Sequence, residues 1–218
     1  ELVRSASYEN ARFLADAWCA AFVWKKTSDL PYPITNDVLR KIERNPHDCA
    51  PWMREEIERL REQYQFFHWH LAFPEVFPLP GKGETPENKD AGWKGGFDVM
   101  LGNPPWERIQ VEAIQFFEFR CPALLELKRS DREEAISRLE VDDPQTFQEW
   151  TEHRRSDSST TAFLKSSGIF PYSTQRNVNS YAVFAELGLT LSSGIGYTGM
   201  VLQSGIATCL LYTSDAAD

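Results

Sequence analysis

The chain has 218 residues, of which 42% are hydrophobic and 25% are charged; these ordinary values exclude a collagen, a coiled coil and a wholly disordered protein. No apolar run approaches the roughly 20 residues that a membrane-spanning helix needs. The net charge of −9 argues against a stand-alone nucleic-acid module, which usually carries a basic face, but it does not exclude an active-site domain whose DNA contacts lie elsewhere.

Helices are expected in the first third of the chain. Residues 1–26 place apolar side chains three and four positions apart, which predicts a helix with one buried face. Two prolines then break the chain, and a short helix is expected over residues 36–44 with Asn36 as its cap. Residues 52–66 carry apolar side chains on one side and Glu and Arg on the other, which predicts a helix with a solvated face.

The middle of the chain is expected to form strands. The aromatic run over residues 65–77 predicts a buried strand, and residues 78–96, rich in Gly, Pro, Lys and Glu, are typical of a surface loop. A short apolar strand is expected over residues 97–102. It leads directly into Asn103-Pro-Pro-Trp106, where two consecutive prolines end the strand because neither can donate to a ladder.

Helical patterns return after this motif. Apolar spacing predicts a helix over residues 107–119, and Ser130-Asp-Arg-Glu133 fits a capping box that opens a helix to about residue 139. Residues 140–176 are polar and contain two prolines, which predicts an insertion or lid of short helices.

The last part of the chain is expected to add one helix and one strand. Residues 179–191 form an amphipathic pattern, residues 192–196 (SSGIG) are typical of a turn, and residues 197–202 predict a strand. The order strand, helix, insertion, helix, strand indicates an α/β fold with crossover helices over a sheet.

The segment Asn103-Pro-Pro-Trp106 carries the residue types that a site for a planar amine needs. In open α/β sheets, ligands bind just outside the carboxyl ends of the strands, which is where this segment is expected. The Asn103 side chain offers an uncharged oxygen acceptor, and the Pro104 carbonyl, which precedes another proline, is an acceptor in a rigid extended geometry. Together they would accept both protons of one exocyclic amine and aim its lone pair at an electrophile. Trp106 supplies a flat face on which a base or amide stacks.

This interpretation competes with a plain turn, since Asn, Pro and Gly are common turn residues and a four-residue motif occurs by chance. The strand before the motif and the aromatic residue within it favour a site. The electrophile implied is a sulfonium methyl donor, and an adenine held in this way must have left its duplex.

Four segments of the chain resemble one protein family. Residues 97–108 (FDVMLGNPPWER) look like the catalytic motif of adenine-N6 DNA methyltransferases of the restriction–modification type, and are most similar to the large methylases and restriction–methylase fusions. Residues 66–77 (FFHWHLAFPEVF), 177–186 (NVNSYAVFAE) and 199–208 (GMVLQSGIAT) resemble the stretches that flank the motif in these proteins. The resemblance covers about residues 12–208, with the four segments in the family's order.

The resemblance implies a Rossmann-like sheet of seven strands, present here in part, and S-adenosylmethionine as cofactor. It assigns Asn103 and Pro104 to the target amine, Trp106 to stacking on the adenine and Pro105 to the rigid turn. The implied partners are double-stranded DNA with a flipped adenine and restriction or defence-system subunits in a prokaryotic cytoplasm. The implied activity is site-specific adenine methylation.

The sequence also departs from the family. No strand followed by a glycine-rich loop occurs before residue 97, so the cofactor-binding residues are expected upstream of Glu1, and the target-recognition domain is expected downstream. The chain starts without an initiator Met and reads as part of a longer protein, which by itself would be inactive or poorly folded. Residues 209–218 (CLLYTSDAAD) do not continue the family pattern and are expected to be foreign.

These features predict three regions. Residues 1–64 form a helical segment, residues 65–208 form the partial catalytic domain with an insertion at about 120–176, and residues 209–218 form a non-native tail.

Other candidate residues are better explained by structure than by chemistry. His68 and His70 would share one face of a strand, but a metal site needs three or four ligands, so packing or a place beside the cofactor is favoured. Glu75 is expected to face solvent, and Glu126 with Lys128 matches only a fragment of a nuclease site. The four cysteines form no C-x-x-C pair, which argues against a zinc ribbon or a disulfide framework and indicates a reducing compartment.

Two alternative functions stay open. RNA-base and protein-glutamine methyltransferases use similar Asn-Pro-Pro-aromatic segments, because a glutamine amide is also a planar nitrogen donor. A methyltransferase-like scaffold that only binds DNA or partner proteins would keep the fold without the reaction.

Overall fold

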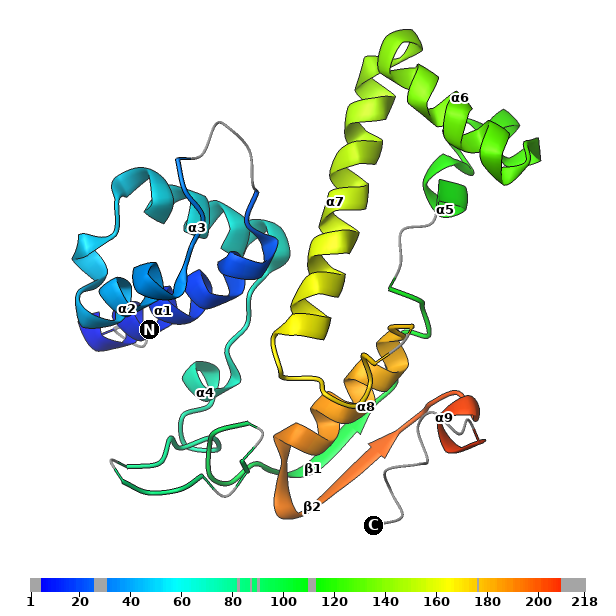
Figure 1. Cartoon of the computed structure of the whole chain (residues 1–218). Helices are drawn as coiled ribbons and strands as arrows, with labels where there is room; N and C mark the ends of the chain where they lie inside the picture. Colours follow the sequence, from blue (N-terminus) through cyan, green and yellow to red (C-terminus); the bar gives the residue numbers. More distant parts are fainter. Residues whose placement is uncertain are drawn as a thin grey trace. The chain divides into compact units, whose positions relative to one another are not determined.

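The computed structural model describes residues 5–25, 31–81, 83–86, 88–89, 91–109, 113–175 and 177–208. The chain divides into two compact units, one formed by residues 1–108 with 162–218 and the other by residues 109–161. Figure 1 shows the elements of each unit in chain order. No helix in the described ranges is long and apolar enough to cross a membrane.

The first unit begins with a group of helices around an apolar core. Helix α1 (Ala6–Val23) packs against α2 (Asn36–Arg44), the short 3-10 helix η1 (Pro46–Asp48) and α3 (Pro51–Tyr64). The most deeply buried side chains of this core come from the three α-helices: Ala17, Ala20, Ile42, Met53, Ile57 and Leu60. The apolar spacing of α1 and α3 thus has the role that the sequence predicts.

The start of each early helix has a local cause. The Ser5 side chain accepts a hydrogen bond from Tyr8 N at 3.2 Å and caps α1. The cap of α2 is Thr35, whose hydroxyl accepts from Val38 N at 3.4 Å, so the predicted cap at Asn36 is wrong by one residue. Helix α3 starts at Pro51. Proline is tolerated there because the N–H groups of the first helical turn have no acceptor within the helix.

The predicted strand over residues 65–77 is wrong. The run instead forms the short helix α4 (Trp69–Ala72) followed by turns. Trp69, Phe73 and Phe77 recur every fourth residue, a helical spacing, and their rings pack with that of Phe97 at centroid distances of 5.0–6.0 Å. The conformation of this segment is therefore set by packing of its aromatic rings and not by pairing with a strand.

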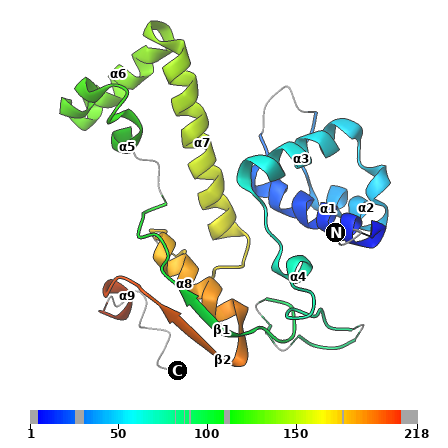
Figure 2. The same ribbon diagram turned by 180° about the vertical axis from the view of Figure 1, so that it is seen from behind.

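The sheet has two described strands, β1 (Phe97–Gly102) and β2 (Ser192–Met200), which run parallel. Helix α8 (Ser180–Leu191) leads into β2 and packs on one face of both strands (Figures 1 and 2). On that face a Cβ added to Gly188 would meet the Met200 and Thr198 side chains, so glycine allows the close approach of helix and strand. The described residues are thus mostly helical, with a small parallel sheet and its helix as the part of the expected α/β fold that the structure shows.

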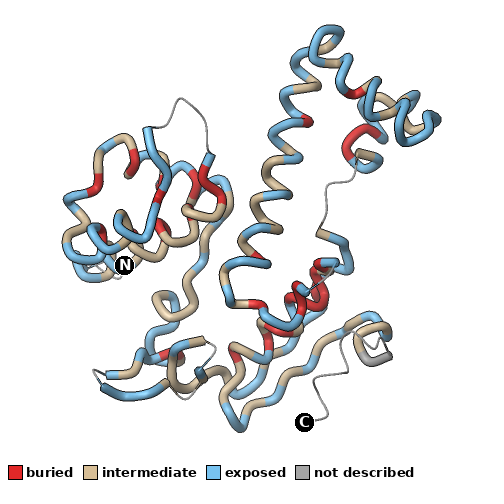
Figure 3. The backbone as a smooth tube through the Cα atoms, viewed as in Figure 1, coloured by how far each residue is buried: buried red, intermediate tan, exposed pale blue. Residues whose placement is uncertain are grey.

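Strand β2 begins at Ser192, five residues before the predicted start. Its first half pairs with β1 through an irregular register, with Phe97 opposite Ser192 and Val99 opposite Tyr197. Gly194 and Gly196 made this part resemble a turn, whereas pairing with a distant strand holds it extended. Figure 3 shows buried residues along α8 and exposed or intermediate ones along the strands. The strands also carry the exposed apolar side chains Val99, Leu101, Ile195 and Tyr197.

The second unit is helical. It contains α5 (Ala113–Phe117), the 3-10 helix η2 (Pro122–Glu126), α6 (Arg129–Asp142) and residues 144–161 of α7 (Pro144–Ser166). Its apolar cluster consists of Phe116, Phe117, Ile136 and Trp150.

Three expectations for this region are corrected. Helix α7 is one helix of 23 residues and not a set of short ones, because Pro144 occupies its first turn, where proline is tolerated. Helix α6 begins at Arg129 with Lys128 at the cap position, so the predicted capping box is not formed; the Ser130 hydroxyl bonds the Asp131 carboxylate instead. Of the helix expected over residues 107–119, residues 107–109 and 118–119 are not helical, residues 110–112 lie outside the described residues, and Ala113–Phe117 form α5. A short helix, α9 (Gly205–Thr208), ends the described chain, and residues 209–218 lie outside it.

Candidate active site at the carboxyl end of β1

The segment Asn103-Pro-Pro-Trp106 follows the last residue of β1, as the sequence predicts. The two strands end together, since Gly102 is paired with Met200 and Val201 N donates to Gly102 O at 3.1 Å. The four residues therefore lie at the carboxyl edge of the parallel pair, the edge at which α/β proteins bind ligands.

Three of the four residues are exposed to solvent and one is buried. Asn103 is exposed, and its side-chain amide makes no hydrogen bond with any residue that the structure describes. Pro104 is buried and anchors the turn, while Pro105 is exposed. Trp106 is 50% exposed, which leaves a large part of the indole surface available for stacking. Both the Asn103 amide and the Trp106 ring are therefore accessible to a ligand and are not sealed inside packing.

The indole ring of Trp106 is held at its polar end. Its Nε1 donates a hydrogen bond to the backbone carbonyl of Val201 at 3.2 Å. Val201 is the first residue after β2, so the bond ties the motif after one strand to the chain after its neighbour. This contact restricts the direction of the ring without burying its face.

Ser180, the first residue of α8, is a member of the site that the sequence analysis did not identify. Its Oγ lies 2.6 Å from Pro105 O and 3.0 Å from Glu107 O, and Glu107 N donates to it at 2.9 Å. Ser180 N also donates to Glu107 O at 2.9 Å. These bonds hold residues 107–108 beside residues 179–180 and explain why no helix begins at residue 107. The only available sequence signal was a small polar residue at the start of a predicted helix.

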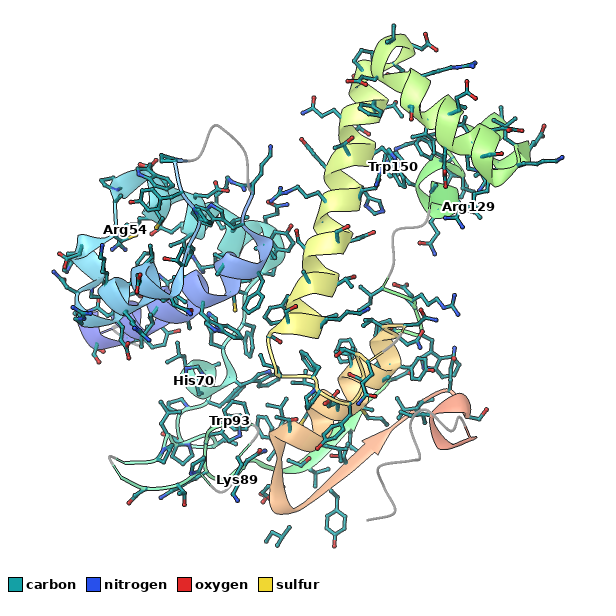
Figure 4. The ribbon with its side chains drawn as sticks, in the orientation of Figure 1. Arg54, His70, Lys89, Trp93, Arg129 and Trp150 are labelled. Carbon is teal, nitrogen blue, oxygen red and sulfur yellow. The ribbon has the colours of Figure 1, made fainter. Side chains whose placement is uncertain are left out.

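The two histidines of residues 68–70 do not belong to this site. His68 Nε2 lies 2.7 Å from the Asp16 carboxylate in α1, and His70 is on α4 (Figure 4). Burial lowers the pKa of His70, and nearby His68 adds to this effect. Within the described ranges, no group of three or more His, Cys, Asp or Glu side chains is arranged to hold a metal ion.

The other residues considered are placed elsewhere. Glu75 is exposed, as expected. Glu126 ends η2 and Lys128 precedes α6, both in the second unit.

A second buried carboxylate lies on α8. Glu186 is 9% exposed and accepts hydrogen bonds from Tyr172 N, Ser173 N and the Ser173 hydroxyl at 3.0, 2.9 and 2.5 Å. With these three donors the carboxylate is paired to the segment before α8, which is a structural role.

The glycine-rich loop expected upstream is not seen among the described residues. In the part of the chain before Phe97 that the structure describes, all regular elements are helical, so no strand leads through a glycine-rich loop into a helix there. No step of the chemistry is therefore assigned to cofactor-binding residues of this chain.

The chain matches a family model of methylases over residues 14–123, about half of its 218 residues. The matched family is the Eco57I restriction-modification methylases, and the chain belongs to this family. The family implies a methyltransferase fold, use of S-adenosylmethionine, and DNA methylation in a restriction–modification system. No curated protein and no solved structure matches the chain significantly.

Proposed function

We propose that the chain carries the target-amine site of a DNA methyltransferase that methylates adenine at N6, in a restriction–modification or phage-defence system of a prokaryotic cell. The observation that supports this most is that Asn103, exposed at the carboxyl end of β1, is followed three residues later by the half-exposed Trp106. Membership of the methylase family supports DNA as the substrate and S-adenosylmethionine as the methyl donor.

The proposed role of the motif is to hold the amine and its base. The Asn103 side-chain oxygen and the Pro104 carbonyl accept the two amine protons, which leaves the nitrogen lone pair directed away from both acceptors. Neutral acceptors are sufficient because the amine proton becomes strongly acidic only after the nitrogen is alkylated. Pro105 keeps the turn rigid, since its ring fixes its own φ and restricts the residue before it.

Trp106 has a separate proposed role. Flipping an adenine out of a duplex costs a few kcal/mol, and stacking on an aromatic side chain returns about 1–3 kcal/mol per base. The exposed part of the Trp106 indole therefore offsets a large part of the flipping cost. The net charge of −9 means that phosphate contacts must come from local basic residues or from other parts of the protein.

The test is methyl transfer by the full-length protein to duplex DNA, to RNA and to a glutamine-containing peptide, with the product nucleoside identified by mass spectrometry. We expect N6-methyladenine from DNA and no product from the other two. Asn103→Ala is expected to lower turnover by about 10²–10³-fold, the usual effect of removing one aligned hydrogen-bonding group at a reacting centre, while S-adenosylmethionine affinity stays the same.

The matched control is Asn36→Ala, which removes another exposed Asn amide from the same unit and should leave turnover unchanged. Methylation of RNA or peptide in preference to DNA would replace the proposed substrate. Wild-type turnover in Asn103→Ala would refute the proposed site.

A further inference from the structure

The backbone on both sides of Trp106 is bonded to one buried hydroxyl. Ser180 is 6% exposed, and its Oγ contacts the carbonyl of Pro105, before the indole residue, and the N–H and carbonyl of Glu107, after it. A serine hydroxyl has one donor and two acceptor positions. Its one proton is shared by the two carbonyl oxygens, with the shorter contact to Pro105 O at 2.6 Å, while the hydroxyl oxygen accepts from Glu107 N.

These bonds do not serve the helix in which Ser180 lies. Asn179 is the cap residue of α8 and makes no side-chain capping hydrogen bond to that helix, and Ser180 is the first helical residue. The Ser180 Oγ contacts are all with residues 105 and 107, which lie more than 70 positions earlier in the chain. The hydroxyl thus links α8 to the motif and does not cap its own helix.

Three attachments together determine where the Trp106 ring lies. The Ser180 hydroxyl holds the main chain before and after Trp106, the Ser180 N–H holds Glu107 O, and Val201 O holds the indole Nε1. The ring itself stays 50% exposed, so packing on its faces contributes less to its position than packing does for a buried side chain. The position of this ring therefore depends more on hydrogen bonds than the position of a buried aromatic ring does.

We propose that Ser180 is a positioning residue that keeps the Trp106 indole in the orientation needed to stack on the target base. This inference rests on the proposed function of the motif. Without the hydroxyl, the Pro105 carbonyl and the Glu107 N–H lose a partner, and the main chain around Trp106 gains freedom. A displacement of about 1 Å in a positioning group can cost about 10²-fold in rate.

The test compares Ser180→Ala, Ser180→Cys and Ser180→Thr in the full-length protein. Cys has nearly the shape of Ser but is a weak donor and acceptor, whereas Thr keeps the hydroxyl. The matched control is Ser192→Ala at the other end of α8, which loses bonds to Gly188 O at 2.8 Å and to the Thr198 hydroxyl at 2.7 Å but does not touch the motif. Thermal unfolding of each variant verifies that the fold is kept.

The first readout does not depend on activity. The protein is labelled with 5-fluorotryptophan, and the Trp106 ¹⁹F resonance is assigned as the one missing in Trp106→Phe. We expect this resonance to shift or broaden in Ser180→Ala and Ser180→Cys, to return close to its original position in Ser180→Thr, and to be unchanged in Ser192→Ala. An unchanged Trp106 resonance in Ser180→Ala would overturn the inference.

The second readout is turnover on DNA in a double-mutant cycle. Ser180→Ala is expected to lower turnover by about 10–100-fold when Trp106 is present, but by less than about twofold in the Trp106→Ala background, because the residue through which it acts is gone. Equal losses in both backgrounds would overturn the positioning role.

The cycle also separates the two proposals. If Asn103→Ala and Trp106→Ala leave turnover intact, the proposed function fails; if they lower it and Ser180→Ala does not, only the role of Ser180 fails.

Discussion

The Asp16 carboxylate on α1 lies 2.7 Å from Nε2 of His68, which precedes α4, and is almost completely buried, with 3% of the residue exposed. Arg61 on α3 lies near the other carboxylate oxygen, with a distance of 3.7 Å between Nε and Oδ2. One acidic side chain therefore ties three segments of the first unit together. It also contributes, after burial itself, to raising the pKa of the Cys19 thiol to about 12.

Loss of this carboxylate should destabilise the fold. Removing the Asp16 carboxylate leaves the largely buried His68 ring without its hydrogen-bond partner, which typically costs about 1–3 kcal/mol. We expect Asp16→Ala to lower the free energy of unfolding by an amount in this range, measured by urea denaturation. The control is Glu9→Ala, which breaks a more exposed pair with Arg12 and should cost less than about 1 kcal/mol. Equal effects of the two substitutions would contradict the structural role of Asp16.

The second buried carboxylate, Glu186, gives a prediction about the segment before α8. Glu186→Gln replaces one acceptor oxygen by an NH₂ group, which faces N–H and O–H donors instead of pairing with them. An unsatisfied buried polar group costs about 1–3 kcal/mol, and we expect a loss of that size in chemical denaturation. Glu58→Gln changes an exposed residue of α3 in the same way and should be neutral. An unchanged free energy of unfolding in Glu186→Gln would show that these hydrogen bonds contribute little to stability.

Gly96 gives a backbone prediction at the start of β1. Its φ is +143°, a region that side chains rarely adopt, and a Cβ there would lie 2.5 Å from Ser193 N and 2.6 Å from the Ser192 carbonyl carbon. Gly96→Ala should therefore destabilise the first unit by about 2 kcal/mol or more, because strain and a backbone clash add. Gly194→Ala in β2 meets nothing within 4 Å and serves as control. Similar melting temperatures for the two variants would argue against the close approach of the chains.

The lowered pKa of His70 predicts how the stability of the fold depends on pH. Burial lowers its pKa from the ordinary value of 6.5, with a further contribution from nearby His68, so the folded state favours the neutral ring. As pH falls through 6.5, His70 of the unfolded chain takes up a proton that the folded chain resists. Its contribution thus makes stability fall with decreasing pH until the folded pKa is reached, and no further below it.

The measurement is urea denaturation from about pH 8 to about pH 5, the interval in which histidines titrate. His70→Gln should reduce the loss of stability across this interval, whereas His47→Gln, at an exposed position, serves as the control. An unchanged pH dependence in His70→Gln would show that another group causes it.

Much of the local structure and the place of the motif follow from the sequence alone. The sequence around α1, α3, α8 and β1 is enough to predict each element. Apolar periodicity and prolines act over a few residues, so no distant contact is needed. The position of Asn103 after a short apolar strand needs no further information. Family membership also depends on the order of residues only. The roles of Asn103, Pro104, Pro105 and Trp106 stay predictions, as do the proposed domain bounds.

Tertiary contacts decided the rest. Residues 192–196 have the composition of a turn, yet pairing with β1 makes them the start of a strand. Residues 107 and 108 have a helical pattern, yet bonds of Glu107 to Ser180 and the pairing of Arg108 with Asn179 hold them beside the start of α8. Ser180, Asp16 and Glu186 acquire their roles from partners that are distant in sequence or in another element. Patterns of periodicity record which face of an element is buried, but they carry no information about which distant group meets a particular hydroxyl or carboxylate.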